Sequence, residues 1–331
     1  MFPTAFGGIP CQPLLGLSLC LLLSCKGGTG LTPDEQQLDF RQEMRQLVMD
    51  LNTYAQGQAP GFFLIPQNGQ KLVQQDGGPA QTYLDAIAGL GREDLYYGYE
   101  ADNRATPVED RSPILTDLRL AHQAGKAILV TDYCWDSDKV ADSRAQVAQE
   151  GFVGFAAPSR ELDVIPADPP PGAAGDSITD LSQIRNFLYL INPGTFADAD
   201  ALVAAVQTTD YDLVILDAFF DEDMLTAAQV AALRQKAGGG RRLVVAYFSI
   251  GEAEDYRYYW QAGWDQDPPS WLAAENRAWR GNYKVKYWQQ GWQDILFGTS
   301  NAYLDRILAA GFDGAYLDII DAFAYFEEEL E

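Results

Sequence analysis

Eight short apolar runs recur along the chain at the spacing of strand–helix units. They lie at residues 62–65, 86–90, 127–131, 152–156, 187–191, 213–216, 243–248 and 314–317. The run 243–248 is apolar at consecutive positions, which is typical of a parallel strand covered on both faces. Helical patterns separate several runs, as at 114–123 and 227–236. This alternation predicts an α/β protein, and eight runs favour a single-domain (β/α)8 TIM barrel over an open sheet with a second domain.

The chain before the first run predicts an amphipathic helix over residues 33–54. Thr32 suits an N-cap, Pro33 suits the first helical position, and Glu35 completes a capping box. Apolar residues then recur at helical spacing as far as residue 54. By contrast, residues 158–182 are rich in proline, glycine and aspartate, and we expect them to form a loop.

Residues 1–25 carry the pattern of a lipoprotein signal peptide. The apolar run 14–23 is followed by Ser24 and Cys25, which predicts Cys25 as the lipidated residue, 26–31 as a tether and 32–331 as the barrel. The first basic residue is Lys26, so the usual basic start of such a signal is missing. The apolar run is too short to predict a membrane-spanning helix. We therefore expect an exported protein, lipid-anchored in the cell envelope at the outer membrane or cell surface, or extracellular.

Charge and composition exclude several classes of function. The formal net charge of −24 is spread along the sequence, so nucleic acid is not an expected partner. A Ser-His-Asp triad or a histidine-rich metal site would depend on the one histidine, His122, which lies in a helix-like stretch. Cys134 is the only thiol expected in the barrel, which implies no disulfide framework. We expect neither a cofactor nor a metal, and carboxylates remain as the acid and base groups.

Polar and acidic residues recur just after the predicted strands. In a parallel barrel these positions share one rim, and active sites form there. A single acid at a strand end is usually a helix cap or a solvated loop residue, but recurrence at successive strand ends favours a site. The residues at these positions are Gln67, Asn68, Arg92, Glu93, Asp132, Tyr133, Asn192, Asp217, Glu252, Glu254, Asp318 and Asp321.

Tryptophan is concentrated in the region after the run 243–248. Six of the seven tryptophans lie there: Trp260, Trp264, Trp271, Trp279, Trp288 and Trp292. They could pack together as the small core of a long loop, or expose indole faces at the rim as platforms for sugars. We weigh these two alternatives evenly. Acidic pairs with aromatic platforms, in a chain without histidine or metal motifs, favour glycoside hydrolysis.

Several segments also resemble a known family. SIGEAEDYRYYW (249–260), WRGNYKVKYW (279–288) and GFDGAYLDIIDAF (311–323) resemble the extracellular glycoside hydrolases related to endo-α-1,4-polygalactosaminidase, glycoside hydrolase family 114. The resemblance covers about residues 211–328. FFLIPQNG (62–69) and AIAGLGREDLYY (86–97) resemble segments that follow the GFDG strand in many relatives, whereas here they precede it. The resemblance thus implies a circularly permuted order, which a barrel tolerates because its first and last strands are neighbours.

The resemblance implies a catalytic pair of carboxylates. Carried over by motif, these are Asp318 in YLD, as the nucleophile or base, and Glu93 in GRED, as the general acid. Glu252 is the strongest substitute. The distance between the two carboxyl groups would distinguish retention from inversion of configuration. The residues expected to bind the sugar or tune the acids are Gln67, Asn68, Asp132, Tyr133, Asp217, Tyr247, Glu254, Arg257, Trp288 and Asp321.

The expected substrate is an α-linked polysaccharide, with a cationic amino-sugar polymer as one candidate because the surroundings are acidic. The main alternative is a non-catalytic, carbohydrate-binding surface lipoprotein on the same barrel, since a fold alone does not prove activity. Intact acids facing an open cleft favour the enzyme, whereas a rim plugged by the tryptophan-rich loop favours the binder. An acidic cation-binding protein ranks last, because the sequence has no EF-hand-like spacing.

Overall fold

The computed structural model describes residues 30–330 of the chain, so the predicted signal peptide and Cys25 lie outside the described residues. Every one of the eight apolar runs contributes to a strand. These strands are β1 (Phe63–Pro66), β4 (Gly89–Glu93), β5 (Ala127–Tyr133), β6 (Val153–Ala157), β7 (Phe187–Leu190), β8 (Leu213–Asp217), β11 (Leu243–Ser249) and β15 (Gly314–Asp318). The largest difference between a predicted run and its strand is at β4, which begins three residues after the start of the run 86–90, because residue 86 still belongs to α2 (Gln81–Ala86).

The eight strands form two parallel sheets that adjoin each other. One sheet has the order β1-β15-β11-β8-β7 and the other β4-β5-β6. A parallel bridge between Gln67 and Gly91 links β1 to β4, and the Ala88 amide donates to the Leu64 carbonyl over 2.9 Å beside it. At the other side β6 contacts β7, but no hydrogen-bonded ladder joins them within residues 30–330. The prediction of an α/β protein with a parallel central sheet is thus confirmed.

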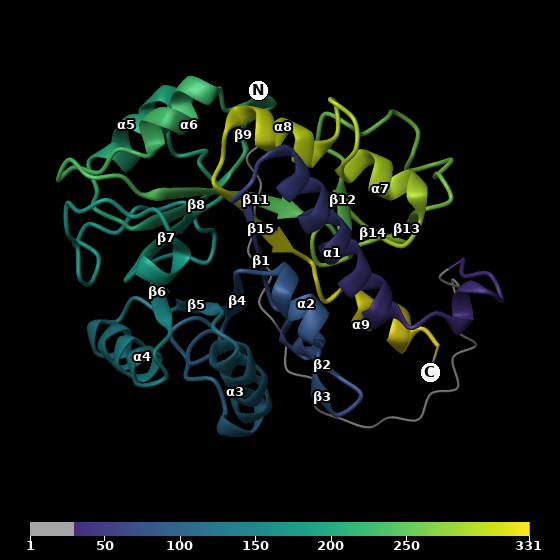
Figure 1. Cartoon of the computed structure of the whole chain (residues 1–331), viewed down its shortest axis with the longest axis horizontal. Helices are drawn as coiled ribbons and strands as arrows, with labels where there is room; N and C mark the ends of the chain where they lie inside the picture. The colour runs from purple at the N-terminus through teal and green to yellow at the C-terminus, as the bar shows by residue number, and fades with distance from the viewer. Residues whose placement is uncertain (1–29, 331) are drawn as a thin grey trace.

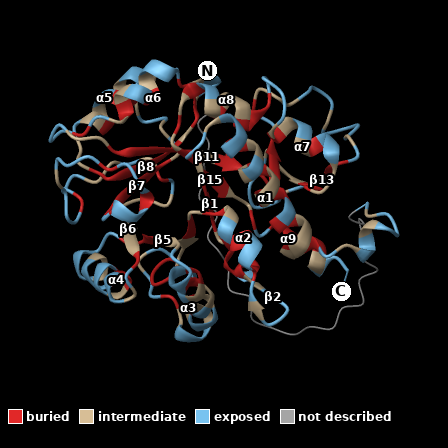
Figure 2. Ribbon diagram, in the orientation of Figure 1, coloured by how far each residue is buried: buried red, intermediate tan, exposed pale blue. Residues whose placement is uncertain are grey.

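Helices cover the outside of the strands (Figure 1). The longer ones are α1 (Phe40–Gln58), α3 (Val108–Gln123), α4 (Ser137–Gln149), α5 (Ala199–Gln207), α6 (Ala227–Leu233) and α8 (Tyr303–Ala310). Figure 2 shows buried residues along the strands and exposed residues on the outward faces of the helices. None of the helices in the described part of the chain is long and apolar enough to cross a bilayer.

The first predicted helix is divided in two. Thr32 and Glu35 make the predicted capping contacts, but on a single 3-10 turn, η1 (Glu35–Gln37). Helix α1 begins at Phe40, where the side chain of Asp39 caps it by accepting from the Gln42 amide over 2.9 Å. The prediction of one helix over 33–54 is therefore wrong at its start, because Asp39 provides a second cap inside the predicted span. α1 also extends four residues beyond 54, to Gln58.

A small antiparallel sheet carries the tryptophan-rich region. It consists of β12 (Glu252–Glu254), β14 (Asn282–Val285) and β13 (Leu272–Glu275), in that order, and the short helix α7 (Gln290–Leu296) follows it. Trp271 packs between Trp264 and Trp292, with ring centroids 5.0 and 5.1 Å away. Trp292 is fully buried and donates to the Ile250 carbonyl over 2.8 Å. These tryptophans form a loop core, whereas Trp279 is 61% exposed.

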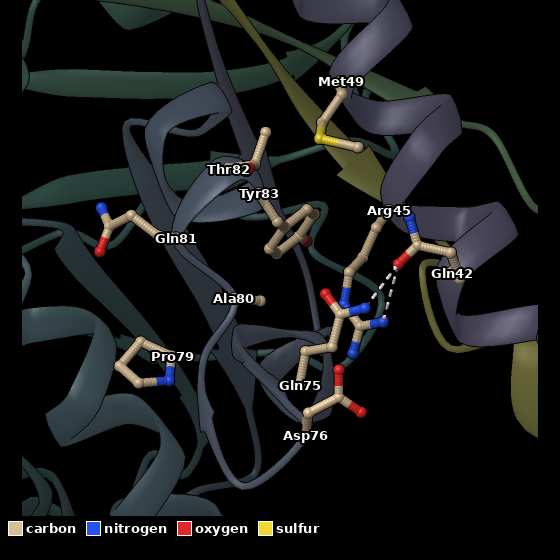
Figure 3. A pocket seen from close by; sticks show the side chains of 10 residues that line it. All are labelled: Gln42, Arg45, Met49, Gln75, Asp76, Pro79, Ala80, Gln81, Thr82 and Tyr83. Atoms are coloured by element: carbon tan, nitrogen blue, oxygen red, sulfur yellow. Dashed lines mark hydrogen bonds between the residues drawn. The ribbon is translucent and has the colours of Figure 1, made fainter.

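A polar pocket of about 340 Å³ lies between α1, α2 and the hairpin of β2 (Gln74–Gln75) and β3 (Gly78–Pro79) (Figure 3). The buried Arg45 guanidinium lines it and donates to the Leu72 and Gln74 carbonyls over 2.9 and 2.6 Å. It also donates to the Gln42 side chain over 3.4 Å. Arg45 thus uses its donors to fasten the hairpin segment to α1.

The segment before α1 is held against the chain after β14 by one carboxylate. Glu35 accepts from Lys286, Trp288 and Gln289 over 3.0, 3.2 and 2.7 Å. The backbone amide of Thr32, three residues earlier in the chain, also donates to the Glu35 carboxylate over 2.9 Å. Burial raises the pKa of Glu35, but these hydrogen bonds outweigh it and lower the pKa from its ordinary value of 4.5 to about 2.

We predict that Glu35→Gln destabilises the protein at neutral pH, because Lys286 would lose its carboxylate while staying buried. The expected loss is about 1–3 kcal/mol. The depressed pKa means that this stabilisation is present above about pH 4.5 and is lost as the pH falls toward 2. Thermal melts should therefore separate the variant from wild type at pH 7 and converge in acid. Glu109→Gln, at an exposed position of α3, is the control. If the melting temperatures of the variant and wild type differed by the same amount at all pH values, the lowered pKa of Glu35 would be contradicted.

Candidate active site

Two carboxylates meet at the carboxyl ends of the parallel strands. Glu93 is the last residue of β4 and Asp318 the last of β15. Strand β1 lies between them, since it pairs with β15 and is bridged to β4 through Gln67. Both acids are half-buried and keep some contact with solvent. They also interact with each other, because the charge of Glu93 contributes to the raised pKa of Asp318.

Glu93 is held by three hydrogen-bond donors. Gln67 Nε2 and Asn68 Nδ2 donate to Glu93 Oε2 over 2.6 and 3.1 Å, and the Tyr133 hydroxyl donates to Oε1. The orientation of the Gln67 amide is set by the Tyr189 hydroxyl, which donates to its oxygen over 2.9 Å. Burial raises the pKa of Glu93, while the hydrogen bonds from Tyr133 and Asn68 oppose that increase.

Asp318 accepts from two hydrogen-bond donors, and its pKa is raised. The Tyr247 hydroxyl donates to Asp318 Oδ2 over 2.6 Å, and the Ile319 amide donates to Oδ1 over 2.8 Å. Burial, with the negative charge of Glu93 as the next cause, raises the pKa of Asp318 from 3.8 to about 7. Because the charge of Glu93 raises the pKa of Asp318, the two carboxyls titrate as a coupled pair.

The chain turns sharply after each strand that contributes to this group. The three residues that follow Gln67, Glu93 and Asp318 all have left-handed backbones: Asn68 (φ 57°), Asp94 (φ 56°) and Ile319 (φ 57°). Asparagine and aspartate tolerate this conformation, but for a β-branched residue it is an outlier that costs about 1–2 kcal/mol. Such strain is characteristic of functional sites, where the surrounding structure imposes it.

Glycines make room for this geometry. A Cβ at Gly251 would lie 2.1 Å from the Ile319 carbonyl oxygen, and a Cβ at Gly69 would lie 2.4 Å from Cγ2 of Ile320. Beneath the acids, a Cβ at Gly91 would lie 1.9 Å from the hydroxyl oxygen of Tyr316. The three glycines therefore let backbone and side chains pack tightly around the strand ends.

Glu252, the third catalytic candidate, is fully buried. Its Oε1 accepts from Lys284 over 2.5 Å and from Asn276 over 2.8 Å, while its buried Oε2 has no hydrogen-bond partner. Asp321 is solvent-exposed. Desolvation by the surrounding protein raises its pKa overall, and the charge of Lys284 acts to lower it. The structure thus gives Glu252 a cationic partner, whereas Glu93 has neutral partners.

Three other predicted residues form one ion cluster. Arg257 donates to both oxygens of Asp217 over 2.9 and 2.8 Å, and to Glu254 over 2.6 Å. The hydroxyl of Tyr256 donates to the second oxygen of Glu254 over 2.7 Å. Arg257 and Glu254 are buried. The cluster fastens the turn after β12 to the end of β8.

Asp132 and Trp288 lie away from the exposed edge. Asp132 is fully buried and accepts from the Tyr96 and Tyr97 amides and the Ser143 hydroxyl over 2.9, 3.2 and 2.6 Å. Burial raises its pKa to about 6. The Trp288 ring packs against Phe40 and Phe326, with centroids 5.1 and 4.8 Å apart. We leave both residues out of the proposed sugar contacts, because their polar groups already have protein partners.

Sequence reasoning missed several residues around the pair. The Arg160 guanidinium lies 4.0 Å from the ring centroid of Tyr133 and pairs with Asp94 and Asp102 over 3.2 and 2.6 Å. It belongs to the loop 158–182, where composition gives no positional signal. Tyr316 lies under the acids with no partner for its hydroxyl, and burial followed by the charges of Glu93 and Asp318 raises its pKa.

The opposite edge of the strands pairs its acids with cations instead. Asp212, just before β8, accepts from Arg185 and Lys236 over 2.9 and 2.6 Å. Burial acts to raise the pKa of Asp212, but these hydrogen bonds lower it below its ordinary value. Asp313, just before β15, pairs with Arg234 and Arg241 over 3.0 and 2.9 Å. In parallel α/β folds this amino edge serves stability, whereas the carboxyl edge carries chemistry.

Within residues 30–330, no group of three or more histidine, cysteine, aspartate or glutamate side chains is placed to hold a metal ion. The half-buried pair, its neutral donors and its raised pKa values mark a candidate active site of the acid–base class on a parallel α/β fold.

Comparison with known proteins gives that class a more definite form. Residues 188–330 match the model of glycoside-hydrolase family GH114. The match supports a glycoside hydrolase function of the GH114 kind; it includes Asp318 and Glu252 but ends short of Gln67 and Glu93.

Three relatives of this chain are described as uncharacterized proteins. One from Methanocaldococcus jannaschii is 37% identical over 155 residues, which is 46% of this chain and 42% of the relative. One from Deinococcus radiodurans is 45% identical over 119 residues, 36% of each chain. One from Thermotoga maritima is 52% identical over 85 residues, 26% of this chain and 25% of the relative. The chain thus spans less than half the length of the curated relatives it matches.

Asp318→Asn is expected to stabilise the protein at neutral pH. An acid with a raised pKa binds its proton more tightly in the folded state, so stability falls as the pH rises from 3.8 to about 7. Asparagine does not ionise, so the variant does not lose stability as the pH rises. Its melting temperature should exceed that of wild type by about 2–4 °C at pH 8. The difference should vanish near pH 4. Asp267→Asn, in an exposed loop, is the control. A variant less stable than wild type at pH 8 would contradict the raised pKa.

Proposed function

We propose that this protein is an exported glycoside hydrolase that cleaves an α-linked polysaccharide by paired-carboxylate chemistry. The observation that carries the proposal is the coupled pair of Glu93 and Asp318, which lie at the ends of the two strands on either side of β1 and remain accessible to solvent. A glycosidase needs one carboxyl ionised and one protonated. Burial and mutual repulsion supply that difference in protonation.

The two roles can be assigned in either order. The resemblance to the family assigns Asp318 as nucleophile or base and Glu93 as general acid. The three donors around Glu93, compared with two at Asp318, favour ionised Glu93 and protonated Asp318 instead. Chemical rescue separates the roles: azide should restore turnover when the nucleophile is truncated to glycine. A substrate with a good leaving group should restore it when the general acid is truncated.

The closed (β/α)8 barrel, as a single domain in residues 32–331, is part of the proposal. It is supported by the continuous parallel order from β7 through β15, β1 and β4 to β6, and by the contact between β6 and β7. The circular permutation is supported by the direct pairing of β15 with β1, which joins the GFDG segment to the FFLIPQNG segment. Matches that cover under half of each chain also suit a permuted order.

The substrate type is proposed from the resemblance and the charge. A polygalactosaminidase-like activity on a cationic amino-sugar polymer suits the net charge of −24 and the excess of carboxylates at the strand ends. Gln67, Asn68, Tyr133 and Tyr247 would tune the acids, and Asp321 would reach the sugar. The binding-protein alternative is less favoured, because the acids stay partly exposed beside the packed tryptophan loop.

Export with a lipid anchor at Cys25 completes the proposal. It depends on the lipobox-like sequence before Cys25. Cys25→Ser should leave the protein unprocessed or release it from membranes, as read by fractionation and mass of the mature chain. Wild-type protein found soluble in the cytoplasm would refute the anchor.

Asp318→Asn and Glu93→Gln should each lower glycan cleavage by about 100-fold or more, because each removes one half of the acid–base pair while keeping its shape. The measurement is the release of reducing ends from a polysaccharide panel that includes α-1,4-linked polygalactosamine. Melting temperatures should show intact folding. Glu252→Gln is the matched comparison: normal turnover in Glu93→Gln together with a loss in Glu252→Gln would move the acid role to Glu252.

A further inference from the structure

The exposed aromatic side chains of the described residues gather at the carboxyl edge of the strands. Four aromatic residues are exposed: Tyr99 (52%), Trp135 (45%), Tyr256 (58%) and Trp279 (61%). Tyr99 follows β4, Trp135 follows β5, and Tyr256 and Trp279 belong to the region after β11. Exposed aromatic rings offer flat apolar faces on which a ligand can stack.

The strand order places these residues on two sides of the acid pair. In space the order runs β11-β15-β1-β4-β5, with Asp318 at the end of β15 and Glu93 at the end of β4. Tyr256 and Trp279 therefore belong to the side beyond Asp318. Trp135 belongs to the side beyond Glu93, with Tyr99 in the loop that leaves β4. The acids lie between two aromatic groups.

Hydrogen bonds fix both groups to the strand ends. On the β5 side, Asn103 Oδ1 accepts from the amides of Trp135 and Asp136 over 2.8 and 3.1 Å, which ties the loop containing Tyr99 to the end of β5. The left-handed backbone of Asn103, with φ 58°, makes this turn possible. These hydrogen bonds fix the backbone at Trp135, so its exposed side chain projects from an ordered turn.

On the β11 side, the turn that carries Trp279 is anchored to Glu252. Asn276, three residues before Trp279, donates to Glu252 over 2.8 Å at the start of β12. The Trp279 amide donates to the Asn276 carbonyl over 3.1 Å. Tyr256 is held by its hydrogen bond to Glu254 and by Arg257, whose guanidinium lies 5.2 Å from the ring centroid.

We propose that the two groups, Tyr99 with Trp135 and Tyr256 with Trp279, are sugar-stacking subsites on either side of the acid pair. The inference rests on the proposed hydrolase function and names the residues that hold the polysaccharide. Aromatic rings present a flat apolar face with a polar edge, and the C–H faces of pyranose rings are apolar in the same way. A chain of sugars that crosses the edge from β5 to β11 contacts both groups and passes over Glu93 and Asp318.

Binding can be measured without turnover in the Asp318→Asn protein. The probes are short and long oligomers of α-1,4-linked galactosamine, and the same sizes of an uncharged α-1,4-glucan. Trp135→Ala and Trp279→Ala should each weaken binding of the long oligomer about 5- to 10-fold, with the double variant close to the product of the two. An oligomer that reaches neither group should bind all variants alike. Trp135→Tyr and Trp279→Tyr, which keep a ring, should restore most of the affinity.

Val108→Ala is the matched control, since Val108 is 59% exposed at the start of α3 and belongs to neither group. Melting temperatures check that each variant is folded. If the parent binds the long oligomer and neither tryptophan variant weakens it, the subsites are refuted and the hydrolase proposal stands. If only one variant weakens binding, the two-sided arrangement is refuted. If the parent binds no member of the panel while the active enzyme cleaves none, the hydrolase proposal fails and takes the subsites with it.

Discussion

The surrounding residues are arranged around the electrostatic repulsion between two carboxylates, Glu93 and Asp318. Two interacting carboxyls at the ends of strands on either side of β1 cannot both ionise freely when burial already disfavours their charged forms. The neighbours are neutral donors, namely tyrosine hydroxyls, side-chain amides and one backbone amide. Such donors orient the carboxyls and only partly offset their raised pKa. A cation bonded directly to either carboxyl would lower the pKa of that carboxyl further.

The two edges of the strands show this contrast in one molecule. At the amino edge, Asp212 and Asp313 are surrounded by arginine and lysine, and the pKa of Asp212 is lowered. At the carboxyl edge the cations make their bonds to other groups. Arg92, the residue before Glu93, donates to Asn68 over 3.3 Å, and its charge acts to lower the pKa of Glu93. Arg160 lies over the Tyr133 ring, Arg257 is paired with Asp217 and Glu254, and Lys284 is paired with Glu252. This separation keeps structural ion pairs and the coupled acids from neutralising one another.

Backbone strain and small residues complete the same arrangement. Ile319 adopts a left-handed conformation beside Asp318, and Gly251 and Gly69 leave room for the turn that it makes. Gly91 leaves room for Tyr316 beneath the pair. A β-branched residue in this conformation costs free energy, so the packing around it must impose the geometry. The sharp turn directs the chain away from the edge and leaves the carboxyl of Asp318 at the strand end.

The sequence by itself determined the strands and the edge at which the acids gather. Consecutive apolar residues predict buried parallel strands, and residues after such strands share an edge, so the eight strands and the placement of Asp318 and Glu93 there could be read from local pattern. Only the tertiary structure decided which acids are free of cations. The side-chain partners of Asp132, Asp217 and Glu252 are, in each case, at least 11 residues away in the chain. The tertiary structure also decided that Trp292 is buried, whereas Trp135 and Trp279 are exposed to solvent. Burial and ion pairing depend on contacts between distant segments, and no local pattern encodes them.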